Sequence, residues 1–297
     1  MTPTTDTIHN PVSSTLLSRQ TIRLSSGDIA YVDQGSREDP AALFVHGVLV
    51  NADLWRNVIW DVADTRRCIA PDLPAHGASP AGDGADLSLE GLAAKLDELC
   101  DGLGLDQVDV VANDTGGAVA QVFAARFPSR IRTLTLTNCD VGENFPPEPF
   151  RPFVELARSG EFGPLVVAMA GDFTLARSEA GFAQGYLRAE ELSDELLTSY
   201  LAPFVPDQGK GLERFLTSSS AEELLAVEPQ LAELHAPAQV LWGDADLFFE
   251  PSWANRLEAM IPGVERVIVV EGGMLFWPDE QSEDLAPLLR EFWTEHA

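Results

Sequence analysis

Short apolar runs recur along the chain and alternate with segments in which apolar residues follow helical spacing. Runs such as "AALFVHG" (41–47) and "RRCIAPD" (66–72) are largely apolar and end in glycine or in a proline–aspartate pair, which is typical of buried strands. The run 21–35 is broken at Ser26-Gly27 and predicts a hairpin. Further buried strands are predicted at 107–114, 131–140, 237–246 and 265–273.

Helical spacing fills the intervals between these strands. The clearest case is 88–104, where Ser88 is a suitable N-cap and Gly102 and Gly104 stand at the end. Strands and helices that follow one another in this way predict a mostly parallel sheet with helices on both faces. The other helices are predicted at 51–64, 116–128, 252–262 and 282–293.

The alternation stops in the middle of the chain. Residues 141–234 show helical segments separated by glycine and proline, without a convincing strand. A helical insertion in an open α/β sheet is expected to cover the carboxyl ends of the strands, where such sheets place their binding sites. We therefore predict an α/β core at 19–140 and 235–297, a helical cap at 141–234 and a flexible arm at 1–18.

The charge and composition narrow the range of partners. The chain has 297 residues, 45% of them hydrophobic, and 47 acidic against 19 basic side chains give a net charge of −28. Such a field repels nucleic acid and anionic membranes, so neither is an expected partner, while a homodimer stays open. A solvating surface is the simpler explanation of the charge. No apolar run has the length of a membrane span.

Cysteine usage and the N-terminus indicate a cytoplasmic protein. Cys68, Cys100 and Cys139 lie in apolar segments without metal-binding spacing, which is typical of reduced, packed thiols. The first residues, "MTPTTDTIHNPVSS", lack the basic start and apolar core of a signal peptide. No motif for a metal or an organic cofactor is present, so we expect neither.

The most informative stretch is "VVANDTGGAVAQ". A buried strand runs through Asp114 and two glycines straight into a helix, which is the layout of a nucleophile elbow. A carboxylate raised on such a turn can attack a carbon that bears a leaving group and form an ester. Asp114 could also be only an N-cap of the helix, since aspartate is favoured there.

In these features the chain resembles α/β-hydrolase-fold proteins, in particular the haloalkane dehalogenase and epoxide hydrolase branch, which uses an aspartate nucleophile. "FVHGVLVNADLWRNVI" resembles the HG oxyanion loop and the Trp-Arg of the next helix, here at Trp55. "APDLPAHGASP" resembles the DxxxHGxS turn, and "VLWGDADLFFEP" resembles the WGxxD acid motif. The resemblance covers nearly everything after the arm and implies the α/β-hydrolase fold.

The resemblance also implies roles for single residues. The backbone N–H groups of Val48, next to His46 and Gly47, and of Thr115 would form the oxyanion or leaving-group hole. Asp246 would be the acid member of the triad. Asp244 is a substitute, and Asp140 is another, because some relatives carry the acid after the preceding strand.

Two family features are missing. Dehalogenases of this branch hold halide with an asparagine after HG and a tryptophan after the nucleophile, where this chain has Val48 and Thr115. Only the Thr115 hydroxyl could donate to a halide, so ordinary dehalogenation is disfavoured. Tyr186 and Tyr200 lie in the cap, where epoxide hydrolases carry proton-donating tyrosines, although packing is an equally good explanation. The cap phenylalanines Phe150, Phe153, Phe182 and Phe204 suggest an apolar pocket.

The third departure concerns the catalytic histidine. In "EGGMLFWPDEQSED" the family's histidine position falls on Leu275, followed by Phe276, and leucine cannot accept a proton. His46 is the nearest histidine to the predicted site, while no feature singles out the remaining four, His9, His76, His235 and His296. A leucine introduced to trap an intermediate would give the same pattern, but the apolar neighbours favour a remodelled site.

These observations predict an enzyme that acts through Asp114 on a small, largely apolar molecule, by epoxide, ester or activated-carbon hydrolysis. A second carboxylate, Asp246, Asp140 or Glu143, would then activate water. The alternatives are a lyase, cyclase or isomerase that uses Asp114 for proton transfer, and a binding protein without activity. Cys139 is a rival nucleophile, although a cysteine at an apolar strand end is more often inert.

Overall fold

The computed structural model describes residues 15–297, and its centre is an eight-stranded sheet. The strand order is β1-β2-β4-β3-β5-β6-β7-β8; β1 and β2 are antiparallel to their neighbours, and all other pairs are parallel. The prediction of a mostly parallel sheet is therefore confirmed. The strands are β1 (Gln20–Leu24), β2 (Gly27–Gln34), β3 (Ala41–Val45), β4 (Arg67–Pro71), β5 (Val108–Asp114), β6 (Ile131–Cys139), β7 (Ala238–Gly243) and β8 (Val264–Val270).

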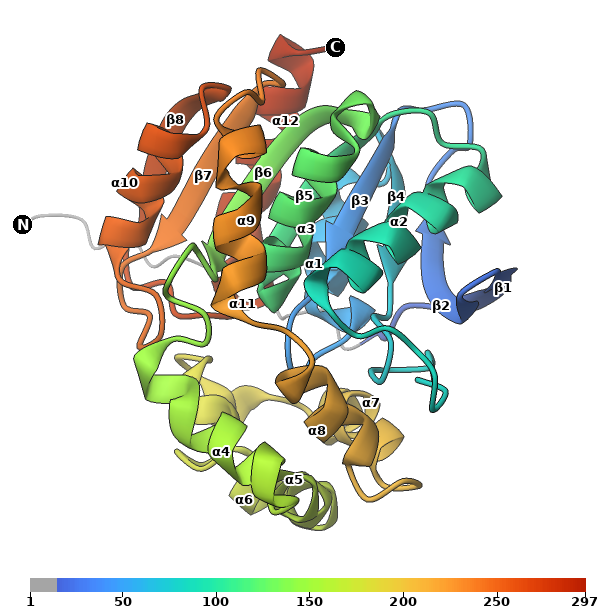
Figure 1. Cartoon of the computed structure of the whole chain (residues 1–297), viewed down its shortest axis with the longest axis vertical. Helices are drawn as coiled ribbons and strands as arrows, with labels where there is room; N and C mark the ends of the chain where they lie inside the picture. Colours follow the sequence, from blue (N-terminus) through green and yellow to red (C-terminus); the bar gives the residue numbers. More distant parts are fainter. Residues whose placement is uncertain (1–14) are drawn as a thin grey trace, which may run out of the picture.

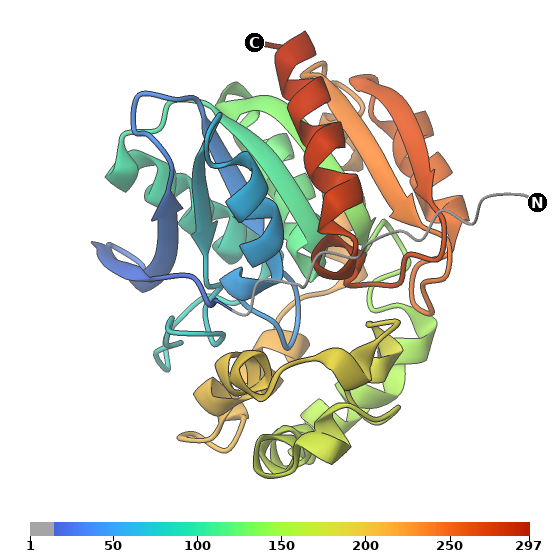
Figure 2. The same ribbon diagram turned by 180° about the vertical axis from the view of Figure 1, so that it is seen from behind.

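Helices cover both faces of this sheet (Figure 1). α2, α3, α9 and α10 lie on one face, and α1 and α12 lie on the other, as the view from behind shows (Figure 2). The central strands are buried along their whole length because both faces are covered. The core helices are α1 (Arg56–Val62), α2 (Leu89–Leu103), α3 (Thr115–Arg126), α9 (Ala221–Leu231), α10 (Pro251–Met260), α11 (Trp277–Glu280) and α12 (Ser282–Glu295), with the 3₁₀ turns η1 (Ala52–Trp55) and η2 (Pro128–Arg130).

A layer of short helices lies beyond the carboxyl ends of the strands (Figure 1). It contains no strand and falls inside the predicted cap range 141–234. The last helix in that range, α9, packs instead against α3 of the core. The cap elements are η3 (Glu148–Phe150), α4 (Arg151–Ser159), α5 (Phe162–Gly171), α6 (Phe173–Ala176), η4 (Phe182–Gln184), η5 (Ala189–Glu191), α7 (Asp194–Leu201), η6 (Ala202–Phe204) and α8 (Lys210–Thr217).

The cap is joined to the core by polar contacts at α11. The backbone N–H groups of Leu187 and Arg188 each donate to Glu280, both at 2.8 Å. Phe276 donates its N–H to the carbonyl oxygen of Gly185, also at 2.8 Å. The loop that precedes α11 is therefore held between the two layers, and this loop contains Leu275.

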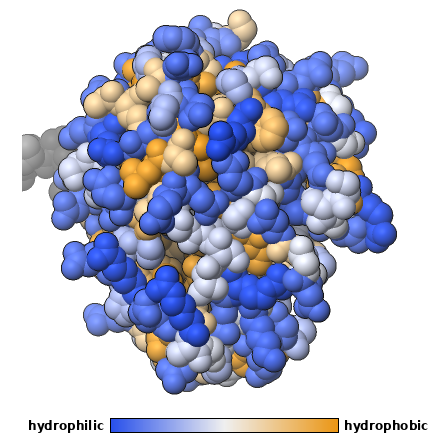
Figure 3. All heavy atoms as spheres, in the orientation of Figure 1, coloured by the Kyte–Doolittle hydropathy of each residue, from blue (hydrophilic) through white to orange (hydrophobic). Residues whose placement is uncertain are grey.

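Most of the predicted arm, residues 1–14, lies outside the described residues, as does His9. The last part of the arm contacts the core, where the Leu17 N–H donates to Asp53 Oδ1 at 2.9 Å. Within residues 15–297 no helix is both long and apolar enough to cross a membrane. The face seen in Figure 3 is mainly hydrophilic, in keeping with the net charge of −28.

Candidate active site

Asp114 stands at the sharp turn between β5 and α3. Its backbone has φ 56° and ψ −137°, a strained conformation for a residue with a side chain. The turn is possible because its neighbours are glycines: a Cβ on Gly47 would lie 2.1 Å from Asp114 Oδ2, and one on Gly116 would lie 2.3 Å from the His46 carbonyl oxygen. The strand–turn–helix geometry predicted at Asp114 is therefore present.

The Asp114 carboxyl does not cap α3 through its side chain. It accepts instead the backbone N–H of Val48 at Oδ2, at 2.7 Å, and that of Thr115. These are the two N–H groups predicted to form an oxyanion hole. The Val48 N–H stabilises negative charge on Oδ2, which leaves Oδ1 as the oxygen available for chemistry.

Burial governs the protonation of Asp114. Loss of hydration raises its pKa from 3.8 to about 6, although the N–H groups of Val48 and Thr115 lower it. No cationic side chain is among the causes of the shift. The carboxylate therefore lies in a poorly solvated place that suits reaction with a neutral molecule.

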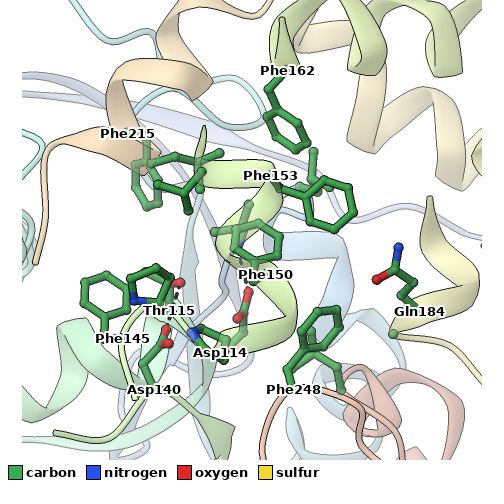
Figure 4. A pocket seen from close by; sticks show the side chains of 18 of the residues that line it. Asp114, Thr115, Asp140, Phe145, Phe150, Phe153, Phe162, Gln184, Phe215 and Phe248 are labelled. Atoms are coloured by element: carbon green, nitrogen blue, oxygen red, sulfur yellow. Dashed lines mark hydrogen bonds between the residues drawn. The ribbon is translucent and has the colours of Figure 1, made fainter. Parts of the chain in front are cut away.

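Asp140 follows β6, directly beside the end of β5. Its Oδ2 accepts the hydroxyl of Thr115 at 3.1 Å, and its Oδ1 is buried without a hydrogen-bond partner among the described residues. Burial, with the nearby charge of Asp114, holds the pKa of Asp140 well above its usual range. The structure thus brings Asp114 and Asp140 together, with Thr115 between them (Figure 4).

Asp246, after β7, is the third carboxyl. Its Oδ1 accepts the Phe248 N–H at 2.8 Å, while its Oδ2 is buried without a hydrogen-bond partner in residues 15–297. Burial raises the pKa of Asp246 from 3.8 to about 7. In the family pattern this acid holds a histidine, and here it carries an unused acceptor.

This unused acceptor leads to a prediction about stability. Because folding raises the pKa of Asp246, ionisation of this carboxyl destabilises the folded state. The destabilisation grows as the pH rises from about 4 to about 7 and is constant above. Asp246→Asn should therefore raise the free energy of unfolding by about 1–3 kcal/mol at pH 8 and by much less at pH 5. Urea unfolding at the two pH values measures this difference, with the exposed Asp106→Asn as the control. Equal effects at both pH values would contradict it.

The side chain at Leu275, where the sequence resemblance predicts the family's histidine, is apolar. Leu275 is 6% exposed and lines the same pocket as Asp114, and its carbonyl oxygen accepts the side-chain amide of Asn113 at 2.9 Å. Phe276 also lines the pocket, and its ring packs against Tyr186 with centroids 4.9 Å apart. The loop is therefore well packed, with no titratable group at Leu275.

None of the four described histidines lines this pocket. His46 uses both ring nitrogens, one with the Gly47 carbonyl oxygen and one with the Leu73 N–H, each at 2.8 Å. Burial lowers the pKa of His46 to about 4 and that of His76 to about 3. His235 is exposed, and His296 pairs with Glu265. His46 is therefore a structural residue and does not replace the missing base.

The pocket above the carboxyls is lined mainly by aromatic rings (Figure 4). Val48, Asp114, Thr115 and Asp140 are among the residues that line it. The other polar side chains that line it are Arg158, Gln184 and Ser219. Such a lining favours a small, largely apolar ligand. The phenylalanines are Phe145, Phe150, Phe153, Phe162, Phe182, Phe215, Phe248, Phe249 and Phe276.

Several predicted binding residues lie elsewhere. Tyr186 and Tyr200 do not line the pocket; Tyr186 donates to Asp279 Oδ2 at 3.1 Å and contacts the Tyr200 hydroxyl at 3.3 Å. Burial raises the pKa of both phenols. Trp55 is fully buried against Phe44, and it too lies outside the pocket. Core packing therefore holds these three side chains outside the pocket lining, which favours the packing explanation over a role in substrate binding.

The remaining sequence candidates also lie outside the pocket lining. Glu143 is exposed and pairs with Arg256 at 3.4 Å, and Asp244 is exposed and accepts the Gly272 N–H at 2.7 Å. Cys139 is fully buried, and this burial holds its pKa well above the usual value, so its thiolate is not available. Phe204 packs against His76 instead of lining the pocket.

Sequence reasoning missed most of the aromatic lining. Phe248 and Phe249 follow the WGDAD turn, and Phe145 follows β6, so both stretches leave the sheet at its carboxyl edge. Their position at this edge could have indicated that these phenylalanines line the pocket, since loops at this edge surround the site in α/β sheets.

Comparisons with known proteins agree with this geometry. A family model described as alpha/beta hydrolase fold matches residues 40–279. A haloalkane dehalogenase of Mesorhizobium japonicum is 32% identical over 197 residues, which are 65% of this chain and 61% of that relative. A cis-3-alkyl-4-alkyloxetan-2-one decarboxylase of Shewanella oneidensis is 23% identical over 295 residues, 93% of this chain and 88% of the relative.

The fold is also found among solved structures. The haloalkane dehalogenase DbeA from Bradyrhizobium elkani superposes with a TM-score of 0.75 at 23% identity, over 94% of this chain and 99% of that one. The family match covers most of the chain, and the strand order and the turn at Asp114 fit it. The chain therefore belongs to the α/β-hydrolase fold family, with haloalkane dehalogenases among its relatives.

Proposed function

We propose that this protein is an enzyme that opens a small, uncharged and largely apolar electrophile by attack of the Asp114 carboxylate. The observation that carries the proposal is the setting of Asp114. Its carboxyl is buried at a strained turn, is held at one oxygen by the Val48 N–H and faces a pocket lined by phenylalanine rings. Backbone strain and a raised pKa together are typical of reactive residues.

The geometry assigns a task to each carboxyl oxygen. Oδ1 is the attacking atom, because Oδ2 is bound to the Val48 N–H at 2.7 Å. After attack, Oδ2 becomes the carbonyl oxygen of an ester. When water then adds to the ester carbon, the same N–H stabilises the charge that develops on Oδ2.

A strained ring that opens at an oxygen fits the site better than an alkyl halide. The only side-chain donor at the two halide positions is the Thr115 hydroxyl, and it already donates to Asp140 at 3.1 Å. A departing ring oxygen can instead take a proton from a protonated carboxyl. The decarboxylase relative is named for an oxetan-2-one, which is a strained ring of this kind. We therefore favour epoxides and small lactones as substrates.

Isotope labelling in a single turnover tests the proposal. With excess enzyme, styrene oxide in ¹⁸O-water should leave one ¹⁸O in the peptide that contains Asp114 and none in the diol, because water attacks the ester carbon. Mass spectrometry of the peptide and of the diol measures both. Label in the diol alone would show direct attack of water on the substrate and would overturn the covalent step.

A lyase or isomerase reaction is a second candidate function, because Leu275, which lines the pocket, cannot activate water. In a lyase or isomerase, Asp114 would move a proton without forming an ester. Conversion of the substrate with ¹⁸O in neither Asp114 nor the product would support that reaction. Tight binding of the substrate without any conversion would indicate a binding protein.

A further inference from the structure

Asp140 lies where a second reacting carboxyl is needed. β5 and β6 are parallel neighbours, and Asp114 is paired with Cys139, the residue before Asp140. Asp140 is 1% exposed and lines the same pocket as Asp114. Figure 4 shows Asp114, Thr115 and Asp140 together, with Phe145 and Phe248 on either side and the other labelled phenylalanine rings above them.

The hydrogen bonds of Asp140 are incomplete. Thr115 donates its hydroxyl to Oδ2, but Oδ1 is buried and has no partner among the described residues. A buried carboxyl with a free oxygen is unfavourable unless that oxygen carries a proton or meets a ligand. A proton on the unpaired oxygen would remove this penalty, and the pocket that the Asp140 residue lines is where a bound molecule could take or return that proton.

The charges around Asp140 favour its protonated form. Burial contributes most, and the carboxylates of Asp114 and Asp246 both raise its pKa, while the Thr115 hydroxyl lowers it. No cation is among these groups. Burial and the two neighbouring carboxylates therefore favour a protonated Asp140.

On the basis of the proposed function, we propose that Asp140 is the proton donor and then the general base of this site, since none of the four described histidines lines the pocket. In the family pattern an acid at this position would orient a histidine. In this chain Leu275 leaves it no histidine to orient, and Asp140 contacts the pocket directly.

Both steps balance with these two carboxyls and water. Asp114 Oδ1 forms a bond to an epoxide carbon, the carbon–oxygen bond of the ring breaks, and the ring oxygen takes the proton of Asp140. Asp140 is then a carboxylate. Water adds to the ester carbon of Asp114; one of its protons ends on Asp140 and the other on the released product oxygen. The products are a diol, ionised Asp114 and protonated Asp140.

Formation of the ester favours loss of the Asp140 proton in the first step and keeps Asp140 ionised, as the base of the second step has to be. Esterification removes the negative charge of Asp114, and that charge is one of the causes that raise the pKa of Asp140. Asp140 thus becomes a stronger acid at the moment when its proton has to leave. The return of the charge on hydrolysis restores the protonated form.

Two substrates of similar size separate a proton-transferring role from a structural one. Styrene oxide has a leaving oxygen that needs a proton, whereas benzyl bromide has a leaving bromide that needs none. Asp140→Asn keeps the size of the side chain and an acceptor for Thr115. It should slow ester formation at Asp114 by at least about 100-fold with styrene oxide and by less than about threefold with benzyl bromide.

Hydrolysis of the ester should be slow in this variant with both reagents. The Asp114 adduct should persist at least about 100 times longer than in the unmodified protein, as followed by intact mass and peptide mapping. Asp106→Asn, an exposed carboxyl before β5, is the matched control and should react like the unmodified protein. Thermal unfolding of both variants checks that they are folded.

The outcomes are distinct. If Asp140→Asn slows both reagents equally, or slows neither and releases the ester normally, Asp140 does not transfer protons. This would leave the proposed attack by Asp114 standing. If the unmodified protein neither converts these reagents nor forms an adduct at Asp114, the proposed function fails, and the role of Asp140 fails with it.

Discussion

Replacing Asp114 by asparagine should lower the turnover of styrene oxide or a small lactone by at least about 10³-fold. An amide cannot form the ester, and it cannot serve as a base. The Val48 N–H can still donate to the amide oxygen, so the oxyanion hole should keep its shape. The measurement is kcat/KM at a pH above 7, where Asp114 is ionised.

The stability of this variant distinguishes lost chemistry from lost folding. The folded-state pKa of Asp114 is raised to about 6, so its ionisation destabilises the fold increasingly as the pH rises from about 4 to about 6, and constantly above. Asparagine removes this effect and also tolerates a positive φ better than most residues. The unfolding midpoint at pH 8 should therefore not fall below that of the unmodified protein.

Asp106→Asn is again the control, because it removes one negative charge at an exposed position. Its turnover should stay within about twofold of the unmodified protein, as expected of a surface substitution. A variant Asp114→Asn that is folded and retains more than about a tenth of the activity would show that another group performs the reaction.

Replacing Asp279 by alanine should lower the free energy of unfolding by about 3–5 kcal/mol. Arg56 contacts the two Asp279 oxygens at 2.7 and 2.8 Å, and Asn57 and Tyr186 donate to the same carboxyl. Arg56 is 6% and Asp279 is 2% exposed. Removing one partner leaves a buried guanidinium without its countercharge, and also removes the hydrogen bond from the cap residue Tyr186 to α11.

A double replacement shows whether the loss of stability in Asp279→Ala comes from the unpaired charge of Arg56. Arg56→Met with Asp279→Leu should destabilise the protein less than Asp279→Ala alone, since no unpaired charge is left. The control is the exposed pair between Arg290 and Asp64, where Asp64→Ala should change stability by less than about 1 kcal/mol. Urea unfolding measures all three. A loss below about 1 kcal/mol for Asp279→Ala would show that water reaches the pair.

Much of the fold could be predicted because the relevant patterns are local. Helix α2 begins after Ser88, whose side chain accepts the Gly91 N–H, and ends at Gly104, as its sequence predicts. The turn at Asp114 needs glycines at fixed neighbouring positions, so it is visible in a dozen residues. The mostly parallel sheet follows from the order of such segments along the chain.

The composition of the site was less predictable. Asp140 and Asp246 were both candidate acids in the sequence, and only the structure shows that Asp140 lines the pocket while Asp246 does not. The packing of Tyr186 and Tyr200 outside the pocket could not be predicted, because Asp279, which accepts the Tyr186 hydroxyl, is far away in the chain. The predictions of a homodimer, of a cytoplasmic location and of partners stay predictions.

The sequence by itself determined the elements, the elbow residue Asp114 and the presence of leucine at position 275, where the resemblance predicts a histidine. These properties depend on spacing within short segments, which backbone geometry dictates. Only the tertiary structure decided that His46 is fully hydrogen-bonded, that phenylalanines from separate segments enclose one pocket, and that Asp140 keeps a free oxygen beside Asp114. The physical reason is that burial and pairing depend on side chains that come from different strands and from the cap, and packing alone brings them together.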